Sequence, residues 1–207
     1  MIGGPRADRL PYMSNGAVSL AFAEELKGYI DFDELDHRRA FRAGEAAGRR
    51  ITLQLTVSTD DVERFLEDDV DAAAVTGWIR CDALGGPLAV ERGSFLLRVD
   101  GDRRRMEYRL EFRDPADAPL TLVGFRELRD APGYDLWSDL ATLYAHVQAG
   151  HDPDSPVVAT AILEIHPDDF AKQLTSFRVS PPLRLDALAR FGSVFAGELW
   201  DAWGSRS

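Results

Sequence analysis

The chain has 207 residues, of which 45% are hydrophobic and 29% charged, a composition typical of a folded globular protein with a sizeable core. Its formal net charge of −11 would repel nucleic-acid phosphates and anionic lipids, which argues against both as partners. The single cysteine, Cys81, excludes an intrachain disulfide and a multi-cysteine metal site. Because no apolar run is long enough to span a bilayer and the first residues lack the apolar core of a signal peptide, we expect a cytoplasmic protein.

The sequence of the first quarter of the chain predicts, in order, a flexible arm, a segment with two possible structures, a loop and a strand. Residues 1–18 are rich in glycine, proline and polar residues, so we expect a flexible arm before a single β-rich domain over 19–207. Residues 20–32 fit either a short helix leading into a strand or one broken strand. Glycines in 44–48 predict a flexible loop. Alternation of apolar and polar residues over 51–57 predicts a half-buried strand.

Two junctions share one pattern. Acidic residues follow the strand at Asp60-Asp61, and residues 62–66 then carry the apolar face of a short helix. Later, residues 158–165 predict a strand, and His166-Pro167-Asp168-Asp169 predicts the start of a second helix. The same helix-capping chemistry explains both junctions without a common origin.

A short sequence pattern also occurs twice. Gly28-Tyr29-Ile30 and Gly77-Trp78-Ile79 are each followed by an aspartate and a leucine at the same spacing. Either an internal duplication or chance explains this repeated pattern.

The middle of the chain predicts an antiparallel meander. Three apolar segments alternate with turn residues at Asp100-Gly101-Asp102 and Asp114-Pro115-Ala116-Asp117. A further strand is expected over 143–147, and apolar residues at helical spacing predict an amphipathic helix over 185–203. The expected fold is therefore mainly β, an antiparallel sandwich or barrel with two short helices and a C-terminal helix.

The sequence carries no recognisable catalytic motif. It has no G-x-S-x-G, no dinucleotide-binding glycine pattern and no phosphate-binding loop, and its histidines lack the spacing of a helical zinc site. Cys81 is expected to be a small buried apolar residue. We therefore expect neither a cofactor nor a metal.

The best candidate site is the segment from 130 to 139. It places three carboxylates in a loop with aromatic side chains, and the candidate ligand-binding residues are Asp130, Tyr134, Asp135, Trp137 and Asp139. The competing interpretation is structural, with a buried Trp137 anchoring the loop and Asp139 capping the next element.

Residues 75–200 also carry several motifs in common with a known module. These are Gly85-Gly86-Pro87-Leu88, Gly93-x-Phe95, Met106-x-Tyr108-x-Leu110-x-Phe112, Gly124-Phe125, Asp130-x-Pro132-Gly133-x-Asp135-x-Trp137-x-Asp139, Thr142-Leu143, Phe177-Arg178 and the helix from Phe191 to Trp200. This block resembles an uncharacterised module that accompanies actinobacterial flavin-dependent sterol oxidases of the glucose–methanol–choline type. The flavin-binding fingerprint is absent here, so the resemblance implies an accessory or binding role in lipid or sterol metabolism rather than oxidase activity.

Three functions follow as hypotheses. The first is a non-catalytic module that binds an apolar small molecule or a partner oxidoreductase. The second is a hydrolase-type enzyme that uses Asp130 or Asp135 with His146 or His151 as acid–base groups. The third is a structural domain that forms homo-oligomers through the C-terminal helix.

Overall fold

A computed structural model describes residues 17–67, 72–100, 103–129 and 141–180, and all structural statements below concern these residues. The predicted N-terminal arm, except for Ala17 and Val18, lies outside them. The candidate segment 130–139 and the predicted helix 185–203 also lie outside them.

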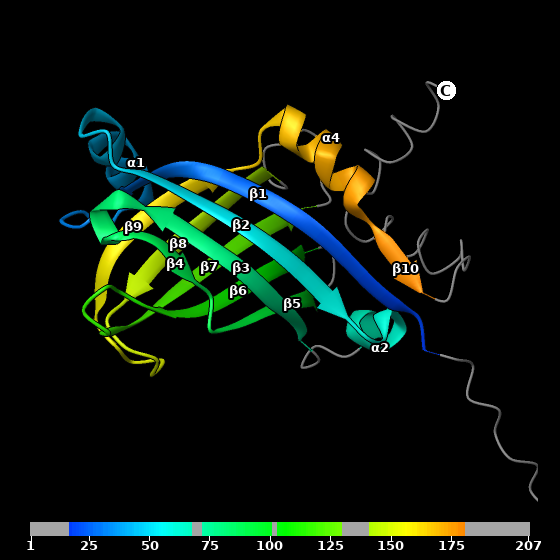
Figure 1. The fold of residues 1–207 in the computed structure, drawn as a ribbon. Helices are drawn as coiled ribbons and strands as arrows, with labels where there is room; N and C mark the ends of the chain where they lie inside the picture. The colour runs from blue at the N-terminus through cyan, green and yellow to red at the C-terminus, as the bar shows by residue number, and fades with distance from the viewer. Residues whose placement is uncertain (1–16, 68–71, 101–102, 130–140, 181–207) are drawn as a thin grey trace, which may run out of the picture.

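Eight strands form a closed antiparallel barrel (Figure 1). Each strand pairs with the next along the chain, apart from a short detour between β3 and β5, and β9 closes the barrel on β1. The barrel strands are β1 (Ser19–Asp31), β2 (Arg50–Thr59), β3 (Ala73–Cys81), β5 (Arg92–Asp100), β6 (Arg103–Arg113), β7 (Pro119–Arg129), β8 (Thr142–Gln148) and β9 (Val157–Glu164). The structure therefore confirms the mainly β fold and decides for a barrel over a sandwich.

Two short strands lie outside the ring. A 3-10 helix (Asp82–Leu84) and β4 (Gly86–Ala89) form the detour, in which β4 pairs with β3. After β9, the chain returns to pair β10 (Arg178–Ser180) with the first residues of β1. Gly85 and Gly86, between the 3-10 helix and β4, both have positive φ, a conformation that glycine adopts readily.

The described residues include three short α-helices, which lie outside the ring of strands: α1 (His37–Ala46), α2 (Val62–Glu67) and α4 (Pro167–Ser176). Figure 1 shows α1 and α2 at opposite ends, while α4 runs along the outside of β1. The helices expected after Asp61 and at Pro167 are confirmed. The Asp61 carboxylate accepts from the amides of Glu63 and Arg64, and Pro167 occupies the first turn of α4.

The expected loop at 44–48 was wrong, because most of it belongs to α1. Asp36 caps this helix by accepting a hydrogen bond from the Arg39 amide at 2.9 Å. Gly44 is buried in its last turn, where an added Cβ would lie 2.4 Å from the carbonyl oxygen of Ile30. The glycine thus permits close packing of a helix on β1 rather than marking a loop.

The segment 20–32 is neither a helix nor a broken strand. It forms the single 13-residue strand β1, which pairs with β2 from Leu20 to Tyr29. The strand of 51–57, the three strands of the meander and the strand over 143–147 are confirmed.

Close contacts between strands explain why a glycine occurs at both position 28 and position 77. A Cβ added to Gly28 would lie 1.9 Å from the carbonyl oxygen of Ile162, and one added to Gly77 would lie 2.0 Å from that of Gln54. Both glycines therefore allow neighbouring backbones to approach where the sheet curves. The same steric need accounts for the repeated glycine whether or not the chain was duplicated.

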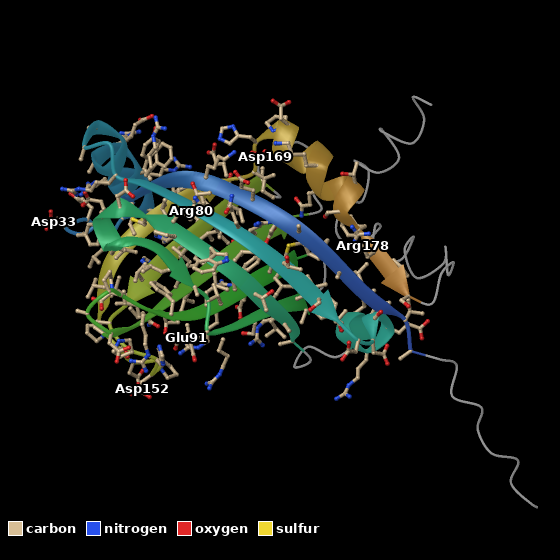
Figure 2. All side chains as sticks on the ribbon, in the orientation of Figure 1. Asp33, Arg80, Glu91, Asp152, Asp169 and Arg178 are labelled. Atoms are coloured by element: carbon tan, nitrogen blue, oxygen red, sulfur yellow. The ribbon has the colours of Figure 1, made fainter. Side chains whose placement is uncertain are left out.

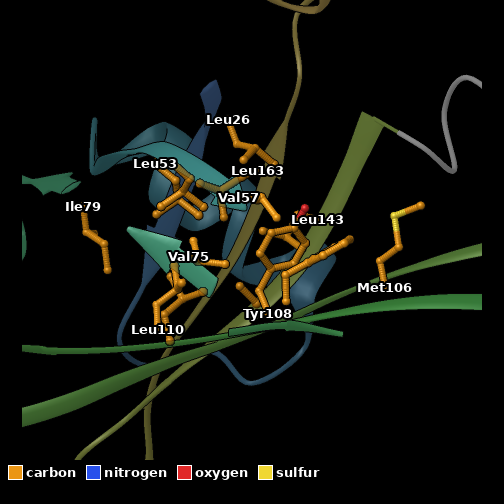
Figure 3. Close-up of a cluster of buried hydrophobic side chains, with 14 of the residues drawn as sticks. Leu26, Leu53, Val57, Val75, Ile79, Met106, Tyr108, Leu110, Leu143 and Leu163 are labelled. Atoms are coloured by element: carbon orange, nitrogen blue, oxygen red, sulfur yellow. The ribbon is translucent and has the colours of Figure 1, made fainter. Parts of the chain in front are cut away.

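The interior of the barrel is packed with side chains from alternate positions of all eight strands. Figure 3 shows residues from opposite walls gathering around Tyr108 of β6, among them Val57, Val75 and Leu143. Ion pairs such as Arg98–Glu107 and Arg105–Glu127 lie on the outer face, and Figure 2 shows side chains such as Arg80 and Glu91 projecting from the molecule. Among the described helices, none is long and apolar enough to cross a membrane.

Candidate functional site

An ion pair lies inside the barrel. Glu24 of β1 and Arg126 of β7 occupy inward-facing positions, between Phe22 and Leu26 and after Gly124. Nη2 of Arg126 donates to Oε2 of Glu24 at 3.0 Å, and the two side chains are 5% and 0% exposed. By contrast, the side chains of the Arg98–Glu107 pair on the outer wall are 52% and 32% exposed. A pair so fully removed from water requires a specific explanation, because its desolvation is costly.

The pair lies just beyond the described ladders of β7 with β8 and of β1 with β9. Pairing of β7 with β8 stops at Phe125, one residue before Arg126. Pairing of β1 with β9 begins at Lys27, three residues after Glu24. The ion pair therefore joins β1 to β7 across the end of the barrel at which β8 and β9 contribute no described ladder.

Tyr108 completes an interior polar triad. The guanidinium of Arg126 lies 5.3 Å from the centroid of the Tyr108 ring, a cation–π arrangement. Burial raises the pKa of Tyr108 well above its usual range and Glu24 acts in the same direction, whereas Arg126 opposes them. Tyr108 is therefore a neutral phenol at physiological pH.

Arg126 is charged. Burial acts to lower its pKa, but Tyr108 and Glu24 outweigh burial and the pKa is raised from its ordinary value. The interior therefore holds a permanent cation whose charge depends on a carboxylate for compensation.

The triad keeps hydrogen-bonding capacity. Among the described residues, neither Oε1 of Glu24 nor Nε of Arg126 has a hydrogen-bond partner, although both atoms are buried. One acceptor of Glu24 and one donor of Arg126 are thus both buried in an apolar interior. Such atoms are rare in native proteins, because each unmade hydrogen bond costs about 1–3 kcal/mol.

Helix α4 covers the open edge of β1 beside Glu24. The Ser176 hydroxyl accepts from the Ala23 amide at 2.9 Å, which supplies the partner that β9 does not reach. Phe177 then stacks on Phe22 with ring centroids 5.1 Å apart. Among the described residues, α4 and the stacking of Phe177 on Phe22 therefore cover β1 next to the triad.

A second cluster lies on the outer face, against α1. The ring centroids of His37 and His146 are 4.3 Å apart, and Tyr144 and Phe125 lie beside His37 at 5.4 and 6.0 Å. Burial lowers the pKa of both histidines, and the neighbouring His146 lowers that of His37 further. Within the described ranges, no group of three or more histidine, cysteine or acidic residues could hold a metal ion.

The predicted ligand residues Asp130, Tyr134, Asp135, Trp137 and Asp139 lie outside the described residues. The two histidines of the hydrolase hypothesis, His146 and His151, contact different residues.

His146 faces His37, whereas His151 lies in the β8–β9 loop with its Nδ1 3.9 Å from Glu111. Cys81 is buried as expected, and burial raises the pKa of its thiol.

The sequence contained a signal for the interior pair that was missed. Glu24 interrupts the apolar phase of Leu20, Phe22 and Leu26, and Arg126 follows the phase of Leu122 and Gly124. A charge in the apolar phase of a strand indicates a buried polar group.

Comparisons with family models, curated proteins and solved structures found no match to the chain. The functional argument therefore rests on the chemistry of the site.

Proposed function

We propose that this protein is a non-catalytic binding module that binds an apolar small molecule at the end of the barrel beside α4 and holds the polar group of that molecule at Glu24 and Arg126. The observation that carries the proposal is the buried ion pair with one unpartnered acceptor and one unpartnered donor.

Three features support a binding role. The interior around the triad is apolar, which suits a ligand that is mostly hydrocarbon. The polar groups lie beside the part of β1 to which α4 is hydrogen-bonded, before the described ladder of β1 with β9 begins. The resemblance of residues 75–200 to a module that accompanies sterol oxidases favours a lipid-like ligand.

A fluorescence titration of the full chain with N-phenyl-1-naphthylamine, a neutral apolar probe, tests the proposal. We expect saturable binding of one probe per chain and displacement of the probe by 1-dodecanol. Native mass spectrometry of the same mixture would show the mass of one bound dodecanol. Absence of saturable probe binding together with absence of a dodecanol adduct would overturn the proposed function.

Ala145→Leu places extra volume on an inward-facing position of β8 that is fully buried. We expect this variant to weaken probe binding. Glu107→Gln is its control, because Glu107 lies next to Tyr108 on β6 but points outward to Arg98 and Arg105. Equal binding by both variants and the unaltered chain, with folding confirmed by circular dichroism, would place the probe outside the barrel.

A further inference from the structure

Helix α1 is attached to the barrel at two places by different kinds of contact. Its C-terminal half packs on β1, where Gly44 lets the helix approach the backbone of Ile30 closely. Its first residue, His37, lies against His146 of β8, with ring centroids 4.3 Å apart. The first attachment is steric and carries no charge. The second joins two side chains that can each gain a proton.

The surroundings of His37 oppose a positive charge on its ring. The residue lies at the positive end of the helix dipole. Its Nε2 atom is buried and has no hydrogen-bond partner among the described residues, so an imidazolium there would carry an unmet buried donor. Burial and the neighbouring His146 lower the pKa of His37, and Asp36 opposes them without outweighing them.

His146 has no counter-charge of its own. Burial lowers its pKa, and its Nδ1 lies 3.1 Å from the neutral hydroxyl of Thr160 on β9. The charged and titratable groups on the elements around α1 are Tyr29 and Asp31 on β1, Arg105 on β6, Glu127 on β7, Tyr144 on β8 and Glu164 on β9. Of these, Asp31 is paired with Arg49, and Glu127 with Arg105.

We propose that the pair of His37 and His146 makes the first turn of α1 a pH-sensitive contact, which leaves the barrel wall in mild acid while the C-terminal half of the helix stays attached. Two adjacent imidazolium ions repel each other, and both gain hydration once the turn has moved away. The tendency to release sets in as the pH falls through 6.5 and levels off below the lowered pKa values of the two rings. This inference is independent of the proposed ligand, because it concerns the outside of the barrel.

Two nearby carboxylates do not titrate in the same range. A hydrogen bond from the Arg39 amide holds the pKa of Asp36 below its usual value, so the cap of α1 keeps its charge in mild acid. Hydrogen bonds from Lys172 and Lys27 do the same for Asp169 of α4. The attachment of α4 therefore provides an internal reference that should not respond to mild acid.

Hydrogen exchange of single amides, measured by NMR on the full chain, tests the proposal. Protection factors are corrected for the intrinsic pH dependence of exchange. The Ala40 amide donates to the Asp36 carbonyl and reports on the first turn, whereas the Ala47 amide donates to Ala43 and reports on the last. The Ala23 amide, bonded to the Ser176 hydroxyl, reports on α4.

Between pH 7.5 and 5.5 we expect protection at Ala40 to fall about threefold or more, with an upper limit of about tenfold for each histidine. This limit is the factor by which protonation of an ordinary imidazole favours the released form over that range. Protection at Ala47 and Ala23 should change less.

A matched variant makes the test specific to the histidine pair. His146→Phe keeps a ring beside His37 but cannot gain a proton, so the fall at Ala40 should shrink to that of one histidine or less. His166→Gln removes an exposed histidine at the start of α4 and should leave the fall unaltered.

Two results would overturn the proposal. One is a fall at Ala40 in the unaltered chain no larger than the falls at Ala47 and Ala23. The other is an equal fall at Ala40 in His146→Phe and in the unaltered chain. Should His146→Phe fail to fold, His37→Gln removes the other titrating group and is compared in the same way.

Discussion

At the scale of single residues, the unusual feature is one cation and one carboxylate inside an apolar barrel. Removing a single partner leaves an uncompensated buried charge, whereas removing both leaves only a change of shape and volume. The energetic role of the pair therefore differs from that of the many ion pairs on the outer wall. Those outer pairs are screened by solvent and contribute little.

Variants of the pair should be strongly non-additive. Arg126→Met should lower the free energy of unfolding by about 3–5 kcal/mol, because Glu24 loses its counter-charge. The double variant Glu24→Gln with Arg126→Met should be destabilised by less than the sum of the two single variants. Urea unfolding of the four proteins measures this coupling. Additive losses would show that the two side chains do not stabilise each other.

At the scale of elements, α1 and α4 cover the outside of the barrel through contacts of different chemistry. Helix α1 places His37 against His146, an uncharged contact that depends on both imidazoles staying neutral. Helix α4 is held to β1 by a charged contact, in which Lys27 donates to Asp169 at 2.7 Å, and by the bond between Ser176 and Ala23. The contact of α1 with the barrel should therefore depend on the protonation of histidines, whereas that of α4 should not.

The histidine contact predicts a loss of stability in mild acid. The pKa values of His37 and His146 are lowered in the folded state, so the unfolded chain binds protons more readily. Their effect on stability is therefore absent well above pH 6.5, appears as the pH falls through 6.5 and levels off below the lowered folded pKa values. Asp36, the nearby carboxylate, opposes the shift at His37 and reduces it.

Urea unfolding at pH 7.5, 6.5 and 5.5 measures this loss. His146→Gln should flatten the dependence, since it removes one titrating group and its repulsion of the other. His166→Gln is the control, because His166 is exposed at the start of α4. A slope in His146→Gln equal to that of the unaltered chain would contradict the prediction.

The contact between α4 and β1 predicts a local effect on hydrogen exchange. Ser176→Ala removes the acceptor of the Ala23 amide, which should expose that amide more often and speed its exchange about fivefold, equivalent to about 1 kcal/mol. Thr175→Ala removes a hydroxyl that bonds within the helix to Lys172 and serves as the control. Unchanged exchange at Ala23 would show that the helix does not protect this edge.

At the scale of the whole molecule, the barrel depends on strands that approach closely as the sheet curves onto itself. Gly28 of β1 lies at the closing contact with β9, and Gly77 of β3 lies at the contact with β2. At both positions a side chain would collide with backbone rather than with a movable side chain. These glycines are therefore requirements of closure.

Gly77→Ala should destabilise the protein by about 3 kcal/mol or more, because it combines a backbone collision with a φ of 145°. Gly48→Ala is the matched control, since Gly48 also has positive φ but an added Cβ meets nothing within 4 Å. It should cost about 1 kcal/mol. Thermal unfolding compares the two variants, and equal losses would mean that strain at φ, and not the strand contact, dominates.

The amino-acid sequence by itself determined the local features. Alternation predicted β2, β8 and the meander, and acidic caps and proline predicted the starts of α2 and α4. These signals are local, because the period of two and the capping of free amides each depend on neighbours within a few residues.

Only the tertiary structure decided how distant residues meet. Closure of β1 on β9 converts the open meander into a barrel, and no local pattern specifies that register. Gly44 suggested a loop from the sequence, whereas in the structure it lies in α1 and lets that helix pack closely against β1. Glu24 and Arg126 lie 102 residues apart in the sequence, so two charges that each interrupt an apolar strand become one site when the barrel closes.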